Sequence, residues 1–130
     1  MSKYPTDLKY TKDHEWARLE GGLIRVGITG FAVEQLGDVT LVDLPKVGDK
    51  VDAQAHFGDI ESVKTVSELF APIAGEVVEV NAALVQSPEK INTDPYGEAW
   101  MVTIRLADPA AAKALMDAAA YKAFVESESK

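Results

Sequence analysis

A seven-residue pattern that occurs twice places the strongest constraint on the fold of this chain. The pattern Pro-x-x-Gly-acidic-x-Val covers residues 45–51 and returns 27 residues later (72 − 45) at residues 72–78. Two similar half-units in tandem predict a β-sandwich or flattened β-barrel with a pseudo-two-fold repeat. In each copy, the Pro-x-x-Gly stretch predicts a tight turn in which glycine permits a positive φ.

Alternating hydrophobicity predicts strands along most of the first hundred residues, so the fold class is mostly β. Residues 23–28 place Ile24, Val26 and Ile28 on one face. Gly21-Gly22 predicts a two-residue hairpin turn that joins this strand to one over residues 15–19. Two more strands are predicted, one over residues 39–44 and one whose shared face is Trp100, Val102, Ile104 and Leu106.

Helical patterns occur in two places. A short helix is predicted near residues 30–36, where Gly37 can end it. Asp108-Pro109 is an N-cap followed by proline in the first turn, which predicts a C-terminal helix over about residues 109–126. Tyr121 and Phe124 are interpreted as packing this helix onto the sheet, and the tail from Glu126 to Lys130 is expected to fray. The 130 residues fit a single domain, with a core over about residues 22–106.

One lysine lies at the predicted tip of a hairpin between the two copies of the repeat. Ile60 and Val66 are strand-like and residues 62–65 predict the turn, so Lys64 is expected at the apex, in water. An exposed lysine has a pKa near about 10.4 and is a poor nucleophile unaided, whereas catalytic Schiff-base lysines are desolvated. A setting flanked by Glu61 and Glu68 suits modification by a separate enzyme. An ordinary solvated surface lysine fits the same pattern.

Composition argues against several classes of function. The chain has no cysteine, so any thiol chemistry needs a thiol from outside. A net charge of −8 disfavours nucleic acid and anionic membranes as partners. No apolar run approaches the roughly 20 residues of a membrane span, and the first residues show no signal or transit pattern, so a cytoplasmic location is predicted. Around His14 and His56 no catalytic set, phosphate loop or metal-ligand spacing can be assembled, which predicts neither an enzyme nor a metal site.

The sequence around Lys64 resembles the lipoylation motif of the glycine cleavage H-protein family. Glu-Ser-Val-Lys at residues 61–64 is followed by Val-Ser-Glu-Leu at 66–69 and by Pro-Ile-x-Gly-Glu-Val-Val-Glu-Val-Asn at 72–81. Further matches in order are His14-Glu15-Trp16, Val26-Gly27-Ile28-Thr29, Leu36-Gly37-Asp38-Val39, Val42-x-Leu44-Pro45, Val47-Gly48, Pro88, Ile91-Asn92, Pro95-Tyr96 and Trp100-Met101. The resemblance covers about residues 8–125, and the ordered set makes it specific.

The resemblance implies a lipoyl-domain fold of the barrel-sandwich hybrid type and a carrier that is not an enzyme. Lys64 would bear a lipoyl group as an amide. The aminomethyl group of glycine would pass from the PLP-dependent glycine decarboxylase (P-protein) to the aminomethyltransferase (T-protein), and electrons would pass to dihydrolipoamide dehydrogenase (L-protein). Lipoyl- and octanoyl-attaching enzymes are further implied partners of a monomeric chain. Glu15 and Glu68 match positions that line the cleft for the loaded arm, whereas Gly30-Phe31 departs from the family pattern there.

A different carrier, the lipoyl domain of a 2-oxo acid dehydrogenase acyltransferase, is the alternative. That module is usually shorter and usually has Asp-Lys-Ala at its tip, while biotin carriers normally show Met-Lys-Met. Val63-Lys64-Thr65 matches neither pattern. His14-Glu15-Trp16 and the C-terminal helix are additional to both modules.

Overall fold

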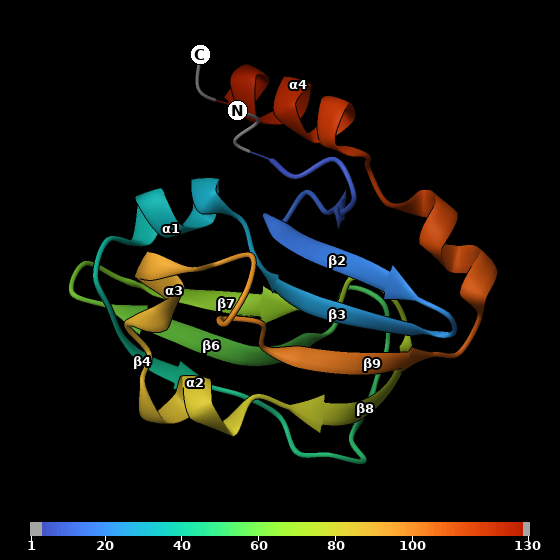
Figure 1. The fold of residues 1–130 in the computed structure, drawn as a ribbon, viewed down its shortest axis with the longest axis horizontal. Coiled ribbons are helices and arrows are strands. Elements are labelled where there is room, and N and C mark those ends of the chain that lie inside the picture. The colour runs from blue at the N-terminus through green and yellow to red at the C-terminus, as the bar shows by residue number, and fades with distance from the viewer. Residues whose placement is uncertain (1–3, 129–130) are drawn as a thin grey trace.

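Two β-sheets form the body of the computed structural model, which describes residues 4–128 (Figure 1). In the larger sheet, six strands follow the order β1 (Lys9–Tyr10), β2 (Glu15–Glu20), β3 (Leu23–Ile28), β9 (Val102–Leu106), β8 (Gly75–Val80) and β5 (Lys50–Val51). The smaller sheet has the order β4 (Val39–Asp43), β6 (His56–Ser62) and β7 (Val66–Phe70). All named pairings are antiparallel, and the two sheets form an open sandwich rather than a closed barrel, which confirms the predicted mostly β fold.

Within the described residues, four α-helices and one 3₁₀-helix lie around the sandwich (Figure 1). They are α1 (Gly30–Leu36), α2 (Ala82–Gln86), α3 (Lys90–Thr93), the 3₁₀-helix Pro109–Ala114 and α4 (Ala118–Glu128). The short helix predicted near residues 30–36 is confirmed, and Gly37 follows it with φ +74°. Thr29 caps its start by accepting a hydrogen bond from the Ala32 N–H at 3.3 Å.

The main core lies between the two sheets. Val26 and Ile104 of the larger sheet and Ile60 and Leu69 of the smaller sheet belong to one cluster of buried side chains, each at most 1% exposed. Their burial follows the period of two in each strand, which turns alternate side chains inward. Burying an aliphatic side chain of this kind contributes roughly 1.5–3 kcal/mol, so this cluster accounts for much of the driving force for folding.

A second apolar cluster joins the N-terminal segment to α4. The Tyr10 and Tyr121 rings stack with centroids 4.7 Å apart, and Tyr4 meets Tyr121 edge-on at 5.0 Å. Leu8 and Trp16 belong to the same buried cluster. Tyr121 therefore packs helix α4 onto the β body, as the helical periodicity predicts.

The repeat identified in the sequence pairs with itself. Strand β5 of the first copy lies antiparallel to β8 of the second, with Lys50 opposite Glu76 and Val51 opposite Gly75. The Val77 N–H donates to the Asp49 carbonyl at 2.8 Å. Glu76 is the equivalent of Asp49 and Val77 is the equivalent of Lys50, so the register is unchanged when the copies are exchanged. This is the local geometry of a pseudo-two-fold axis.

The predicted turns of the repeat hold for one copy only. Gly48 has φ +97°, as the tight-turn prediction requires. Gly75 instead begins strand β8 without a positive φ, so the turn prediction is wrong there. A Cβ at residue 75 would overlap the backbone oxygen of Arg105 on the neighbouring strand. Glycine is required at residue 75 by the close approach of two backbones rather than by a turn.

The C-terminal region differs from the single helix predicted over residues 109–126. Asp108 caps the 3₁₀-helix by accepting from the Ala110 N–H at 3.1 Å, but helical structure then stops and Met116 pairs with Tyr10. Two backbone hydrogen bonds of 2.8 and 2.9 Å join Tyr10 and Met116, which gives the edge of β1 a partner and interrupts the helix. Asp117 caps the new start by accepting from the Ala120 N–H at 2.8 Å.

Two further expectations are corrected. Helix α4 continues to Glu128, so the prediction that the tail frays from Glu126 is wrong as far as residue 128, and residues 129 and 130 lie outside the described part of the chain. Trp100 precedes strand β9 and packs against the second cluster, so it does not share the core face of Val102 and Ile104. The Arg25 guanidinium lies 4.5 Å from the centre of its ring.

Candidate functional site

Lys64 lies at the exposed tip of the hairpin between β6 and β7, as the sequence predicts. The Ser62 N–H donates to the Thr65 carbonyl at 2.8 Å and closes the turn. The Ser62 hydroxyl also accepts from the backbone N–H groups of Lys64 and Thr65, both at 3.2 Å. Serine therefore satisfies the donors of the turn, which holds the backbone of Lys64 in place while its side chain stays in solvent.

The surface around Lys64 is apolar at the tip and acidic on the flanking strands. Val63 is 69% exposed and Val66 is 58% exposed. Glu61 lies opposite Val66, and Glu68 lies opposite Asp59 on the same hairpin. Within the described residues, the Lys64 amine makes no ion pair. An exposed, unpaired amine on a well-defined hairpin is accessible to a modifying enzyme.

Glu15 is the buried acid of the candidate site. Glu15 is the first residue of β2. Its side chain reaches across to the smaller sheet, where Oε2 accepts a hydrogen bond from the Phe70 N–H at 2.7 Å. The residue is only 1% exposed, and Oε1 is buried without a hydrogen-bond partner among the described residues. Burial raises the pKa of Glu15 well above its ordinary value, and the nearby charge of Asp13 raises it further.

Glu68 lies on β7 in a different environment from that of Glu15. It is exposed on β7 and precedes Phe70, the partner of Glu15, by two residues. Residues two apart on a strand lie on one face, roughly 7 Å apart along the chain. The buried carboxylate of Glu15, on β2, thus contacts β7 two residues along the chain from the exposed Glu68.

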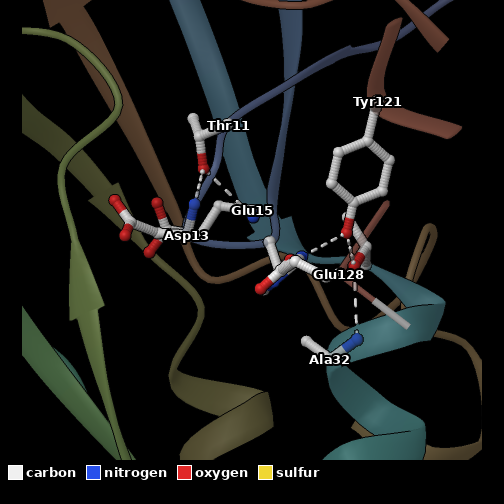
Figure 2. Close-up of polar contacts among 8 residues, drawn as sticks. Thr11, Asp13, Glu15, Ala32, Tyr121 and Glu128 are labelled. Carbon is white, nitrogen blue, oxygen red and sulfur yellow. Dashed lines mark hydrogen bonds and ion pairs between the residues drawn. The ribbon is translucent and has the colours of Figure 1, made fainter. Parts of the chain in front are cut away.

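His14 belongs to a polar network that the sequence does not reveal. Its Nδ1 lies 2.8 Å from the Tyr121 hydroxyl, which is also 2.7 Å from the Thr29 hydroxyl, and its Nε2 lies 3.0 Å from a carboxylate oxygen of Glu128. Figure 2 shows the Tyr121 hydroxyl at the centre of these contacts and Thr11 beside Glu15. Burial lowers the pKa of His14, and Glu128 opposes that shift. The network ties α4 to the start of β2, so His14 has a structural role.

Gly30-Phe31 is the place at which the sequence is expected to depart from the family pattern, and both residues make defined contacts in the structure. Its ring lies 4.7 Å from the His14 ring, and the preceding Gly30 N–H donates to the Tyr96 hydroxyl at 2.8 Å. The side chains of His14, Phe31 and Tyr96 therefore lie around the first turn of α1. The sequence alone gives no indication that Phe31 contacts His14.

The second histidine lies in a separate contact. His56 Nε2 is 2.8 Å from Asp59 Oδ1, and this hydrogen bond raises the pKa of His56. Among the described residues, no group of three acidic, histidine or cysteine side chains is arranged to hold a metal ion. Nor does any helix in that part of the chain have the length and apolar character to span a membrane.

An open β-sandwich with a paired repeat and an exposed lysine at a hairpin tip defines the class of swinging-arm carrier domains. The family model described as "Glycine cleavage H-protein" matches residues 8–128. The chain belongs to the glycine cleavage H-protein family.

Curated relatives and a solved structure agree with this assignment. A glycine cleavage system H protein of Anaeromyxobacter sp. (strain K) is 61% identical over 95% of this chain and 97% of its own length. The corresponding protein of Symbiobacterium thermophilum is 55% identical over 97% and 98% of the two chains. The crystal structure of a glycine cleavage system H protein from Mycobacterium marinum superposes with a TM-score of 0.80 at 44% identity, covering 90% of this chain and 94% of that one.

These matches disfavour the alternative carrier. The family model matches residues 8–128, which include the segment with His14-Glu15-Trp16 at one end and α4 at the other.

Proposed function

We propose that this chain is the lipoyl-bearing carrier protein of a glycine cleavage system, with Lys64 as the attachment residue. The observation that supports the assignment is the exposed Lys64 at the tip of the β6–β7 hairpin, in a chain that matches the family over residues 8–128. The role is that of a carrier and not of an enzyme, and residues 1–130 form one carrier domain.

The hairpin tip fits a covalently attached arm. An amide bond to the lysine needs an accessible amine, and the Lys64 side chain is exposed. When bound, the lipoyl group supplies a redox-active sulfur pair at the end of a long flexible arm, which a chain without cysteine cannot supply itself. Lys64 anchors that arm, and the hydrogen bonds of Ser62 keep its base in a fixed position.

The partners follow from the carrier role. They are the glycine decarboxylase (P-protein), the aminomethyltransferase (T-protein), dihydrolipoamide dehydrogenase (L-protein) and the enzymes that attach lipoyl or octanoyl groups. The chain acts as a cytoplasmic monomer. Each partner has to accommodate the same tip, where Val63 and Val66 offer apolar surface beside the lysine.

The assignment predicts one lipoyl adduct per chain, on Lys64 alone, in protein isolated from lipoate-sufficient host cells. Intact mass spectrometry gives the number of adducts, and peptide mapping gives the position. The other lysines are the internal control, because Lys50, Lys113 and Lys122 are exposed as well. An adduct on a different lysine, or unmodified protein from such cells, would overturn the proposal.

Glu15 and Glu68 are proposed to shelter the aminomethyl cargo. The buried Oε1 of Glu15 has no partner among the described residues, so it would accept a hydrogen bond from a cationic amine that reaches it, and Glu68 adds an exposed acidic group on β7. Replacing Glu68 with glutamine should speed loss of the cargo, as ammonia and formaldehyde, by up to about five-fold, since an exposed ion pair contributes about 0.2–1 kcal/mol.

The matching Glu15→Gln variant should also speed the loss, because its carbonyl is held by the Phe70 N–H and the amide nitrogen in place of Oε1 cannot accept a hydrogen bond from the amine. Glu61→Gln is the control, since Glu61 is an exposed acid on the neighbouring strand. The two acids would have no sheltering role if all three variants released ammonia at the parent's rate.

A further inference from the structure

The tip that carries Lys64 rests against a turn that follows helix α1. The Val63 N–H donates to the Asp38 carbonyl at 3.1 Å, which joins the hairpin to this turn. The stem of Lys64 lies over Gly37, where an added Cβ would be 3.2 Å from the Lys64 Cε. Gly37 also has φ +74°, so any other residue would be strained there as well as crowded. The Lys64 side chain and the hairpin tip therefore lie against the backbone of residues 37–39.

Asn92 of helix α3 is hydrogen-bonded to both ends of this backbone segment. Its Nδ2 donates to the Gly37 carbonyl at 2.7 Å, and its Oδ1 accepts the Val39 N–H at 2.9 Å. The adjacent Ile91 is fully buried in the main core, which fixes the short helix. The two contacts need one donor and one acceptor on a single short side chain, a combination that asparagine provides and aspartate does not.

We propose that Asn92 is a positioning residue for the modification of Lys64, acting through residues 37–39. This inference rests on the proposed function, in which Lys64 is the attachment residue. Without Asn92, the Gly37 carbonyl and the Val39 N–H lose their partner and the turn loses its fixed geometry. The bond from Val63 to Asp38 weakens with it, and the hairpin tip samples more conformations. An attaching enzyme must then order the tip itself, which reduces its rate of productive binding.

Asn81 provides a matched control. Asn81 is buried, at 8% exposed, whereas Asn92 is half-buried, and the Asn81 Nδ2 donates to the carbonyls of Glu98 and Trp100 at 2.9 and 2.7 Å. These carbonyls belong to the segment before β9, and none of the Asn81 hydrogen bonds reaches the lysine hairpin or residues 37–39. Loss of Asn81 removes two comparable bonds from elsewhere in the fold.

The test compares the full-length parent with Asn92→Ala, Asn92→Asp and Asn81→Ala. Each unmodified protein is incubated with a lipoate-attaching ligase, lipoate and ATP, and the adduct on Lys64 is followed by mass spectrometry. Loss of the bridge should reduce kcat/KM by about ten-fold in Asn92→Ala, the factor that corresponds to about 1.4 kcal/mol of hydrogen bonding. The change should lie mainly in KM. Asn92→Asp keeps the acceptor but not the donor and should also be slowed, while Asn81→Ala should match the parent.

A second measurement separates positioning from general stability. Hydrogen exchange of the Val63 amide should accelerate by about ten-fold in Asn92→Ala and stay at the parent's rate in Asn81→Ala, even where the two variants lose similar unfolding free energy. The inference is overturned if the Asn92 variants are modified as fast as Asn81→Ala, or if Val63 exchange is unchanged. If the parent itself acquires no adduct on Lys64, the proposed function fails, and the Val63 exchange rates still decide whether Asn92 holds the tip.

Discussion

Exchanging Val63 and Lys64 is expected to abolish lipoylation while the unfolding transition stays where it is. The double change Val63→Lys with Lys64→Val preserves composition, charge and almost all of the local volume. Both residues are exposed at the hairpin tip, where substitutions usually cost within about 0.5 kcal/mol. The amine, however, moves by one residue and leaves its place over Gly37, so an attaching enzyme that recognises the apex finds valine there.

Mass spectrometry after incubation with a lipoate ligase gives the extent of modification, and thermal unfolding gives the stability. Lys64→Arg is the control, because a guanidinium keeps the charge and cannot form the amide, so that variant should also remain unmodified. Lipoylation of the exchanged protein at residue 63, at the rate of the parent, would show that recognition does not depend on hairpin geometry.

Replacing Glu15 with glutamine is expected to stabilise the fold at neutral and alkaline pH and to leave it nearly unchanged in acid. Burial raises the pKa of Glu15 above its ordinary value of 4.5. A group whose pKa is raised by folding contributes stability that is fully present below the unfolded pKa and is lost as the pH rises through the folded pKa. Glutamine never ionises, and its carbonyl still accepts the Phe70 N–H. The gain should therefore grow as the pH rises, because only the parent then has to hold a buried negative charge.

Denaturant unfolding of parent and Glu15→Gln at pH 4, 6 and 8 measures this difference. The two free energies of unfolding should nearly coincide at pH 4 and diverge as the pH rises. Glu61→Gln controls for the loss of one negative charge, because Glu61 is exposed. A difference that is constant from pH 4 to pH 8 would mean that Glu15 does not ionise at a higher pH in the folded state than in the unfolded one.

The parts of the fold that the sequence predicts are those set by local pattern. The alternation of apolar residues predicts β3, and the Gly21-Gly22 turn predicts its hairpin with β2. The helical pattern before Gly37 predicts α1 and the residue at which it ends. The same local logic predicts the exposed tip at Lys64. These elements depend on neighbours in the chain, which single-sequence reasoning can use.

The parts that the sequence does not predict depend on partners far along the chain. Glu15 is buried because Phe70, 55 residues away, supplies a donor, and Asn92 is placed by backbone groups 53 and 55 residues away. The sequence pattern suggests that Gly75 is a turn glycine, but glycine is required there because the backbone of Arg105 lies beside it. The C-terminal helix is interrupted because Tyr10 takes Met116 as a backbone partner. None of these contacts leaves a periodic signal.

The ends of the two sheets bear on how this chain avoids self-association. An unpaired edge strand is a template on which another chain can add and start an aggregate, and short, lysine-bearing edges suppress this. The six-stranded sheet ends in β1 and β5, which are two residues long and each begin with a lysine, Lys9 and Lys50. Met116 also occupies the edge of β1.

The smaller sheet blocks its edges with side chains. Glu15 accepts the Phe70 N–H on the outer edge of β7, and Asn92 accepts the Val39 N–H on the outer edge of β4. Each of these side chains occupies one backbone N–H that an incoming strand could otherwise use, and the net charge of −8 repels approaching copies. These features together disfavour the addition of a second copy as an extra strand.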